Sequence, residues 1–273
     1  MTSEMLPNPP DLFDLFGKHL VGLLLRVQDL GLEPNQASLR DIAIPGILLR
    51  VEDAAFFLTA GHVIEDLQNG LSGNKFRLEK CFLVDTFGAG VKSNYPIAFD
   101  FVNSFRPHLV NDQAGLDFGL ILLAPYYERL LKINGIVPFE EVNWATQHKV
   151  DFEFYFLLGF PAELNRSPPS SGDAEVHPVL IPMDPIDILP DDLEVPKADR
   201  FYAKIREGMD LDLRGMSGGP VFGFRTKPQL EYWIVAIQSG WYQQHRISVG
   251  CRMQTIGWMV SEAIRKMKED GLV

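Results

Sequence analysis

The sequence predicts an all-β protein that ends in one α-helix. Short apolar runs recur along the chain and are separated by segments rich in Gly, Pro, Asn and Asp, which is typical of antiparallel strands joined by turns. Residues 256–270 carry the clearest helical pattern, because their apolar side chains repeat at helical spacing. With 273 residues, of which 46% are apolar, the chain is long enough for two packed barrels or one large domain.

The first half is expected to form one β-barrel over residues 19–135. Residues 1–18 precede it as an N-terminal arm, which has neither the basic segment nor the long apolar segment of a secretory signal. The apolar run that follows is far shorter than the ~20 residues that span a bilayer, so we interpret it as a strand. Strands are predicted at residues 20–25, 42–51, 54–58, 76–84, 97–102 and 116–123. Residues 62–67 suggest one helical turn, and residues 124–133 predict a short helix before a connection at residues 136–150.

The second half is expected to form another β-barrel over residues 151–255. Its strands are predicted at residues 151–160, 201–205, 233–238 and 247–253. Residues 163–200 are rich in proline and acidic residues, which argues against regular sheet for much of this insertion. We interpret it as an exposed loop, and the alternative is a lid or a partner-binding loop. The helix at residues 256–270 would pack its apolar stripe on the second barrel.

Charge and cysteine content exclude several classes of function. The chain has 25 basic and 36 acidic residues, and no cluster of Lys and Arg predicts a nucleic-acid surface. The two cysteines, Cys81 and Cys251, have no metal-binding spacing and favour a reducing compartment, although one bridge between them stays possible. The sequence therefore predicts a cytoplasmic protein with no membrane segment and no metal-binding cysteine motif.

One serine stands in a setting that suits a nucleophile. The stretch LRGMSGGPVFG at residues 213–223 surrounds Ser217 with Gly215, Gly218 and Gly219. Glycines allow a tight turn that presents a hydroxyl and aims backbone N–H groups at one point, as acyl transfer requires. A glycine-rich turn without catalytic function is the ordinary alternative.

A base and an orienting carboxylate can be assigned from their contexts. His62 follows a buried apolar run in FFLTAGHVIEDL and is flanked by small residues, and it could equally be a core histidine. Asp117 begins the apolar run LDFGLILL, where a buried carboxylate needs a partner. Asp112 is a rival for this role but lies in a polar loop, and Asp117 could also face solvent at the start of its strand. The order and contexts of His62, Asp117 and Ser217 favour the catalytic interpretation of all three.

These three blocks resemble those of trypsin-like (chymotrypsin-fold) serine peptidases, and most of all the bacterial, cysteine-poor members. TAGH, DFGLILL and GMSGGPV stand in the family's order of His, Asp and Ser. The resemblance implies two six-stranded antiparallel β-barrels with a C-terminal α-helix. It also implies a serine endopeptidase with the triad His62, Asp117 and Ser217, and an oxyanion hole from the N–H groups of Gly215 and Ser217. Such a peptidase needs no metal and no organic cofactor.

The resemblance also implies a place for the substrate. The pocket for the residue before the scissile bond would have Leu211 at its base and Gln238, Ser239 and Gly240 at its edge. Met216 stands where secreted trypsins carry an aspartate that pairs with a new N-terminus, so activation by that pairing is not expected.

The Ser217 stretch and the predicted activity each have an alternative interpretation. GxSxG at residues 215–219 also matches the nucleophile elbow of α/β-hydrolases, but that elbow leads into a helix and here an apolar strand is expected. The alternative to an active peptidase is a catalytically silent or latent module of the same fold that binds a peptide or a protein partner. Either way, the expected partner is a peptide or protein, with a regulatory partner possible.

Overall fold

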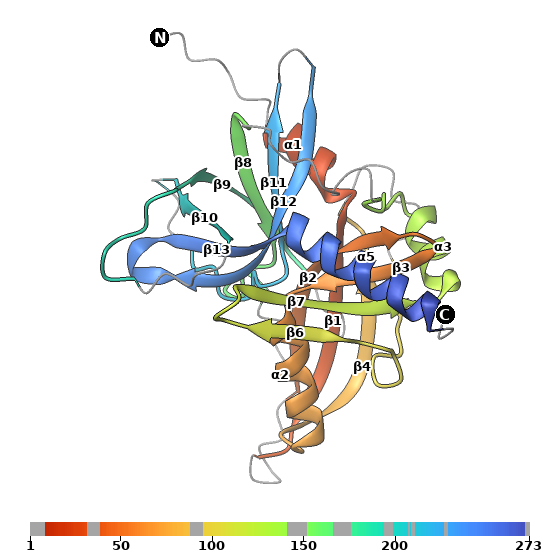
Figure 1. Ribbon diagram of the computed structural model, residues 1–273. Helices are drawn as coiled ribbons and strands as arrows, with labels where there is room; N and C mark the ends of the chain where they lie inside the picture. Colours follow the sequence, from red (N-terminus) through yellow and green to blue (C-terminus); the bar gives the residue numbers. More distant parts are fainter. Residues whose placement is uncertain are drawn as a thin grey trace.

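The computed structural model describes residues 9–31, 39–87, 95–140, 152–165, 176–193, 199–206, 208, 211–226 and 229–270. These residues form a mostly β protein with an antiparallel sheet in the first half, a closed six-stranded barrel in the second half and a C-terminal helix (Figure 1). The predicted fold class is confirmed. Residues 1–8 of the expected arm and residues 141–150 of the expected connection lie outside the described residues.

The sheet of the first half has seven strands in the order β5-β4-β1-β2-β3-β7-β6. Their bounds are β1 (Leu20–Asp29), β2 (Leu39–Val51), β3 (Ala54–Thr59), β4 (Phe76–Val84), β5 (Ile97–Ala98), β6 (His108–Asn111) and β7 (Leu116–Leu123). Side chains alternate between two apolar clusters, so that Ile47 and Leu49 enter one and Leu48 enters the other. This alternation explains why β1 and β2 are apolar on both faces. The seventh strand, one more than expected, is the short β6, which pairs with β7.

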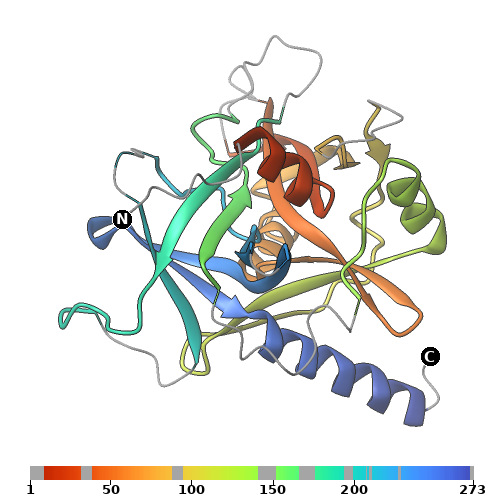
Figure 2. The ribbon, with the colours of Figure 1, turned by 90° about the horizontal axis from the view of Figure 1, so that it is seen from above.

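The second half closes into a barrel with the strand order β10-β13-β12-β11-β8-β9. Its strands are β8 (Phe154–Gly159), β9 (Val179–Pro185), β10 (Arg200–Ile205), β11 (Pro220–Arg225), β12 (Glu231–Tyr242) and β13 (Ile247–Arg252). The inward residues Leu157, Met183, Phe201 and Val221 fill its interior. Figure 2 shows this barrel beside the first sheet, with β12 and β13 on the side nearest the C-terminal helix.

Four helices accompany the strands in the described part of the chain. They are α1 (Pro9–Gly17), α2 (Gly61–Ser72), α3 (Pro125–Ile133) and α5 (Met253–Glu269), with a short 3₁₀ turn, η2 (Gln243–His245), before β13. The apolar stripe of α5 buries Met253, Ile256, Val260 and Ile264 in a cluster that also contains residues of both halves. The helix thus packs across the junction of the two halves instead of on the second barrel alone.

Four elements differ from the expectation. Strand β9 lies inside the proline-rich insertion, where the Pro182 carbonyl oxygen accepts a bond from the Arg206 N–H although proline has no N–H of its own to donate. Helix α2 continues to Ser72, beyond the single turn that the sequence suggested. The predicted strand at 97–102 is reduced to β5, and the polar β6 was not predicted. Residues 166–175 and 194–198 of the insertion lie outside the described residues.

Both cysteines are buried free thiols, so no bridge joins Cys81 to Cys251. Burial raises the pKa of the Cys81 thiol to about 12 and that of the Cys251 thiol to about 11. No helix in the described ranges is long and apolar enough to cross a membrane.

Candidate active site

His62 stands in the first turn of α2, directly after β3. Ala60, between the strand and the helix, provides no capping side chain, so the first N–H groups of the helix need another acceptor. Asp117 supplies it, because its Oδ1 accepts the bond from the His62 backbone N–H at 2.9 Å. Gly61 permits this close approach, since a Cβ there would stand 2.7 Å from the Leu109 carbonyl oxygen and 2.8 Å from that of Phe118.

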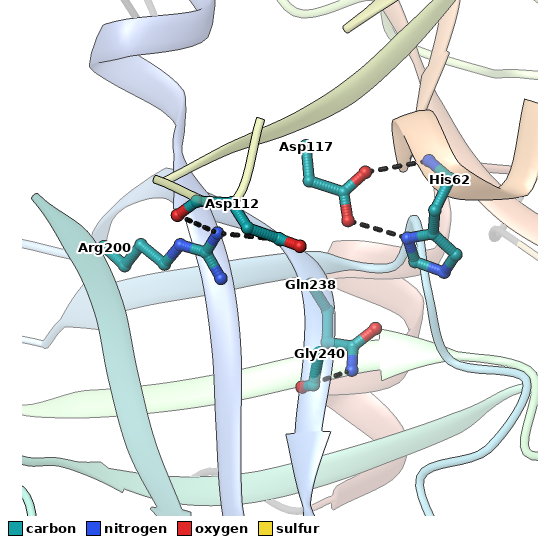
Figure 3. A network of polar contacts seen from close by, with 6 residues as sticks. All are labelled: His62, Asp112, Asp117, Arg200, Gln238 and Gly240. Atoms are coloured by element: carbon teal, nitrogen blue, oxygen red, sulfur yellow. Dashed lines mark hydrogen bonds and ion pairs between the residues drawn. The ribbon is translucent and has the colours of Figure 1, made fainter. Parts of the chain in front are cut away.

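The second oxygen of Asp117 holds the ring of His62. Asp117 Oδ2 lies 2.7 Å from His62 Nδ1, and the two side chains face each other in Figure 3. A carboxylate only accepts hydrogen bonds, so Nδ1 carries the proton and Nε2 of the neutral ring keeps its lone pair. Asp117 is 6% exposed, whereas the His62 side chain is 34% exposed. This pair therefore offers a base at the surface that is oriented by a buried acid.

Several carboxylates act on the charge of His62. Burial alone would lower the pKa of His62, but the hydrogen bond and the charge of Asp117 outweigh it. The charges of Asp66 on α2 and of Asp112, in the turn after β6, act in the same direction. The result is a pKa of His62 above its usual value.

The Ser217 turn lies between the interior of the second barrel and β11. Gly215 and Gly218 have positive φ values of 88° and 96°, a conformation that other residues rarely adopt. Met216 is fully buried in the barrel interior and anchors the turn. The chain continues as strand β11, which agrees with our rejection of the α/β-hydrolase elbow.

Close packing joins this turn to the strand that leads to His62. A Cβ on Gly218 would stand 1.9 Å from Thr59 Oγ1 and 2.4 Å from the Pro45 carbonyl oxygen. Thr59 itself donates to that carbonyl at 2.9 Å. Ser217 is therefore next to a glycine that touches the last residue of β3, three positions before His62, and the structure brings the two sequence blocks together.

The backbone N–H groups of the turn fall into two sets. Those of Met216, Gly218 and Gly219 donate to the carbonyl oxygens of Leu213, Gln238 and Met216, at 3.0, 2.8 and 2.9 Å. Within the described ranges, the N–H groups of Gly215 and Ser217 have no hydrogen-bond acceptor. The two donors that the sequence suggested for an oxyanion hole are thus unengaged.

The residues expected around a substrate pocket lie beside the same turn. Leu211 packs on the interior cluster that contains Met216. Gln238 pairs through its backbone with Gly218 and Gly219 and is 1% exposed. Ser239 lies at a bulge of β12, between Gln238 and Gly240. His245 Nε2, on the turn before β13, lies 3.1 Å from a carboxylate oxygen of Asp192.

Two contacts near the site were not predicted. The Arg200 side chain, 9% exposed, reaches from β10 to the carbonyl and carboxylate oxygens of Asp112 at 3.2 and 3.3 Å (Figure 3). Cys251 on β13 is hydrogen-bonded to the backbone of Asp117. Both contacts fix the segment that carries Asp117 against the second barrel. Asp112, the rival for the orienting role, is hydrogen-bonded to Arg200, whereas the His62 ring is bonded to Asp117. No sequence signal marks Arg200 or Cys251, because their contacts depend on how the two halves meet.

Among the residues whose positions are described, no three His, Cys, Asp or Glu side chains form a group that could hold a metal ion. The chemistry available here is that of a hydroxyl, an oriented imidazole and free backbone donors.

No protein-family model matches the sequence, and no curated protein sequence matches it. Solved structures that resemble this chain include a thermostable serine protease AL20 from an extremophilic microorganism, with 13% identity over 90% of this chain and 95% of that one, at a TM-score of 0.49. HL collagenase has 13% identity over 96% of both chains, at 0.49. A Glu endopeptidase has 12% identity over 88% of this chain and 90% of that one, at 0.45.

Proposed function

We propose that this chain is a serine endopeptidase that acts through Ser217, His62 and Asp117. The observation that supports this proposal is the packing of Gly218 on Thr59, because Thr59 ends the strand that leads to His62, whose ring is oriented by Asp117. Each of the three residues has an ordinary structural explanation alone. An oriented base, a serine and unengaged N–H donors at one junction are the set that acyl transfer needs.

The proposed reaction runs through an acyl-enzyme. Ser217 Oγ attacks the carbonyl carbon of a peptide bond while His62 Nε2 takes its proton. The developing oxyanion accepts bonds from the N–H groups of Gly215 and Ser217, each worth ~3 kcal/mol. His62 then gives the proton to the leaving amine, and a water molecule releases the acyl group by the same steps. Asp117 stabilises the imidazolium throughout.

The substrate in this proposal is a peptide segment bound beside the Ser217 turn. Leu211, Gln238, Ser239 and Gly240 would contact the residue before the scissile bond. We also propose a reducing, cytoplasmic location, which the two free thiols favour.

Labelling with a fluorophosphonate probe, followed by peptide mapping, tests the proposal. We expect Ser217 alone to be labelled, and labelling to be lost in Ser217→Ala and His62→Ala and strongly slowed in Asp117→Asn. Ser72→Ala, which removes an exposed hydroxyl on α2, is the matched control and should label like the wild type. A folded wild-type protein that no probe labels would overturn the proposal and favour the silent or latent binding module.

A further inference from the structure

A groove runs alongside α5 on the first half of the molecule. It is lined by side chains of β3, β7, α5 and the segment that leads into β6, most of them apolar, and its volume is about 720 Å³. In Figure 1, α5 runs alongside β3 and β7, which supply two sides of the groove. None of the residues of the Ser217 turn lines it, although Phe118, which does, directly follows Asp117. The groove is therefore a site of its own, separate from the candidate catalytic residues.

The groove exists because α5 carries more apolar surface than the protein buries. Beside its buried stripe, Met259, Ala263 and Met267 form a second stripe, with a spacing of four residues, and this stripe lines the groove. On the opposite side, Phe105 is 56% exposed and Leu122 is 40% exposed. Apolar side chains from several elements that are left in water at one place mark a binding surface.

The dimensions of the groove suit a short helix. From Met259 to Lys268 it follows α5 for nine residues, which is about 13 Å. From Phe118 to Leu122 it follows β7 for four residues, which is again about 13 Å. A helix of this length and about 10 Å in diameter occupies about 1,000 Å³, so the groove holds more than half of it and leaves one face in water. A single alkyl chain is much thinner and would leave most of the groove empty.

The groove ends at the hairpin between β2 and β3, where two carboxylates stand side by side. Glu52 is engaged by an ion pair with Lys268 of α5. Asp53, the next residue, is exposed and forms no ion pair within the described ranges. A partner in the groove therefore meets one unpaired negative charge at this end.

Asp53 also lines a second hollow, which continues the groove and has a volume of about 470 Å³. The rings of Phe99 and Tyr127, with centroids 5.0 Å apart, line this hollow together with Asp100. Like Asp53, Asp100 has no ion pair in the part of the chain that the structure describes. Carboxylates beside aromatic rings are suited to a lysine or arginine side chain, through ion pairing and cation–π contacts.

We propose that the groove binds an amphipathic helix of a partner protein, about nine residues long, that has a lysine or arginine at one end. The apolar face of this helix packs between the Met259–Met267 stripe and β7. Its basic side chain enters the second hollow, near Asp53 and Asp100. The two methionines favour this use, because their flexible side chains adapt to the surface of a helix. The inference does not depend on the proposed peptidase function.

The first test measures binding of labelled peptides to the full chain carrying Ser217→Ala, by fluorescence anisotropy. Three peptides of about 14 residues are compared: Leu and Lys at helical spacing, Leu and Glu in the same pattern, and a scrambled Leu/Lys sequence. We expect the patterned Leu/Lys peptide to bind at least about fivefold more tightly than the other two. Ala263→Trp fills the groove from an exposed position and should weaken this binding at least about tenfold. Gln254→Trp, exposed on α5 outside the groove, is the matched control and should bind like the parent.

The second test reverses a charge. Asp53→Lys should reduce the preference for the Leu/Lys over the Leu/Glu peptide about fivefold. Asp14→Lys makes the same change on α1, outside both hollows, and should keep the preference.

Three outcomes would overturn the inference. They are equal binding of the patterned and scrambled peptides, patterned binding that survives Ala263→Trp, and a groove that takes up decylamine but neither patterned peptide. Dimerisation of the chain that Ala263→Trp abolishes, without peptide binding, would also overturn it and assign the groove to a second copy. Fluorophosphonate labelling of Ser217 is measured separately, so peptide binding without labelling would overturn the peptidase and leave the groove assignment intact.

Discussion

The carboxylate of Asp117 divides its two oxygens between the backbone and the ring of His62. One oxygen caps the start of α2 and the other orients the imidazole, so the position of the base and its tautomer depend on one side chain. A carboxylate is also favourable at a helix N-terminus, which carries a partial positive charge. This double use explains why a buried acid is tolerated at the head of an apolar strand.

The charge of Asp112 gives a testable effect on His62. Because Asp112 raises the pKa of His62, Asp112→Asn should lower it and move the acid limb of the labelling rate to lower pH. Asp112 is largely exposed, so the shift should shrink as salt is added. The measurement is the rate of fluorophosphonate labelling against pH, with Asp14→Asn on α1 as the control. A limb that stays in place or moves to higher pH contradicts the assignment.

Gly218 offers a second test with an internal control. In Gly218→Ala the positive φ should cost about 1–2 kcal/mol of unfolding free energy, because an alanine is strained in this conformation. The new methyl group would also clash with Thr59. Gly208 has a similar φ of 91°, but nothing lies within 4 Å of a Cβ built there, so Gly208→Ala should lose only the stability that the backbone strain costs. We expect Gly218→Ala to lose more stability in urea and to lose labelling, while Gly208→Ala keeps labelling. Equal losses in both variants would mean that the contact with Thr59 is unimportant.

At the scale of elements, α5 stabilises the molecule through one buried stripe. Ile256 is fully buried, whereas Trp258, two positions later, is 62% exposed. Ile256→Ala should therefore cost about 2–5 kcal/mol of unfolding free energy, because it leaves a cavity at the junction of both halves. Trp258→Ala removes more atoms but should change stability by only about 0.5 kcal/mol. Urea unfolding of both variants checks this, and a larger loss for Trp258→Ala would contradict the packing described for α5.

The sequence identified most elements where apolar pattern alone decides the structure. The runs that became β2, β3, β7 and β8 were recognisable because both of their faces are buried, and α5 because its stripe is long. Strand β6 escaped notice since His108 and Asn111 are polar, and its pairing is imposed by β7. Strand β9 escaped because Pro182 and Pro185 argue locally against sheet, while β8 and β10 supply partners on both sides.

The residues of the candidate site divide in the same way, into those with a recognisable local sequence and those whose contacts depend on distant segments. His62, Asp117 and Ser217 stand in local contexts that the sequence displays. Arg200 acts through a contact with Asp112 in the other half of the molecule, and the bonds that Gln238 forms with the Ser217 turn also join residues far apart in the sequence, so no local pattern contains them. Their roles became visible only with the register of β10 and β12 against their neighbours.

At the scale of the whole molecule, one apolar cluster joins both halves and a buried histidine bridges them. His19 Nδ1 donates to the Val137 carbonyl oxygen at 2.8 Å, and Nε2 lies 2.9 Å from the hydroxyl of Tyr232 on β12. Burial first, and the charge of Lys18 as well, lower the pKa of His19 to about 4. His19 thus belongs to the first half and holds a strand of the second.

This histidine should make stability depend on pH. Unfolded His19 binds a proton below about pH 6.5, whereas folded His19 binds one only near pH 4. The free energy of unfolding should therefore decrease as the pH is lowered through this window. The full loss is about 3 kcal/mol. Urea unfolding at about pH 7 and about pH 5 measures it. His19→Phe should flatten the dependence, and the exposed control His177→Gln should keep it; a wild-type slope that survives in His19→Phe would contradict the assignment.

The bonds between Gln238 and the Ser217 turn also bear on how such a protein would be made on the ribosome. A nascent chain that has emerged only as far as Gly223 already contains His62, Asp117 and Ser217. It still lacks β12, which supplies the two backbone bonds that fix the turn, and β13, which closes the barrel. The peptidase proposed here would therefore stay inert until β12 and β13 had been translated, and could not cut the chains and chaperones around it before then.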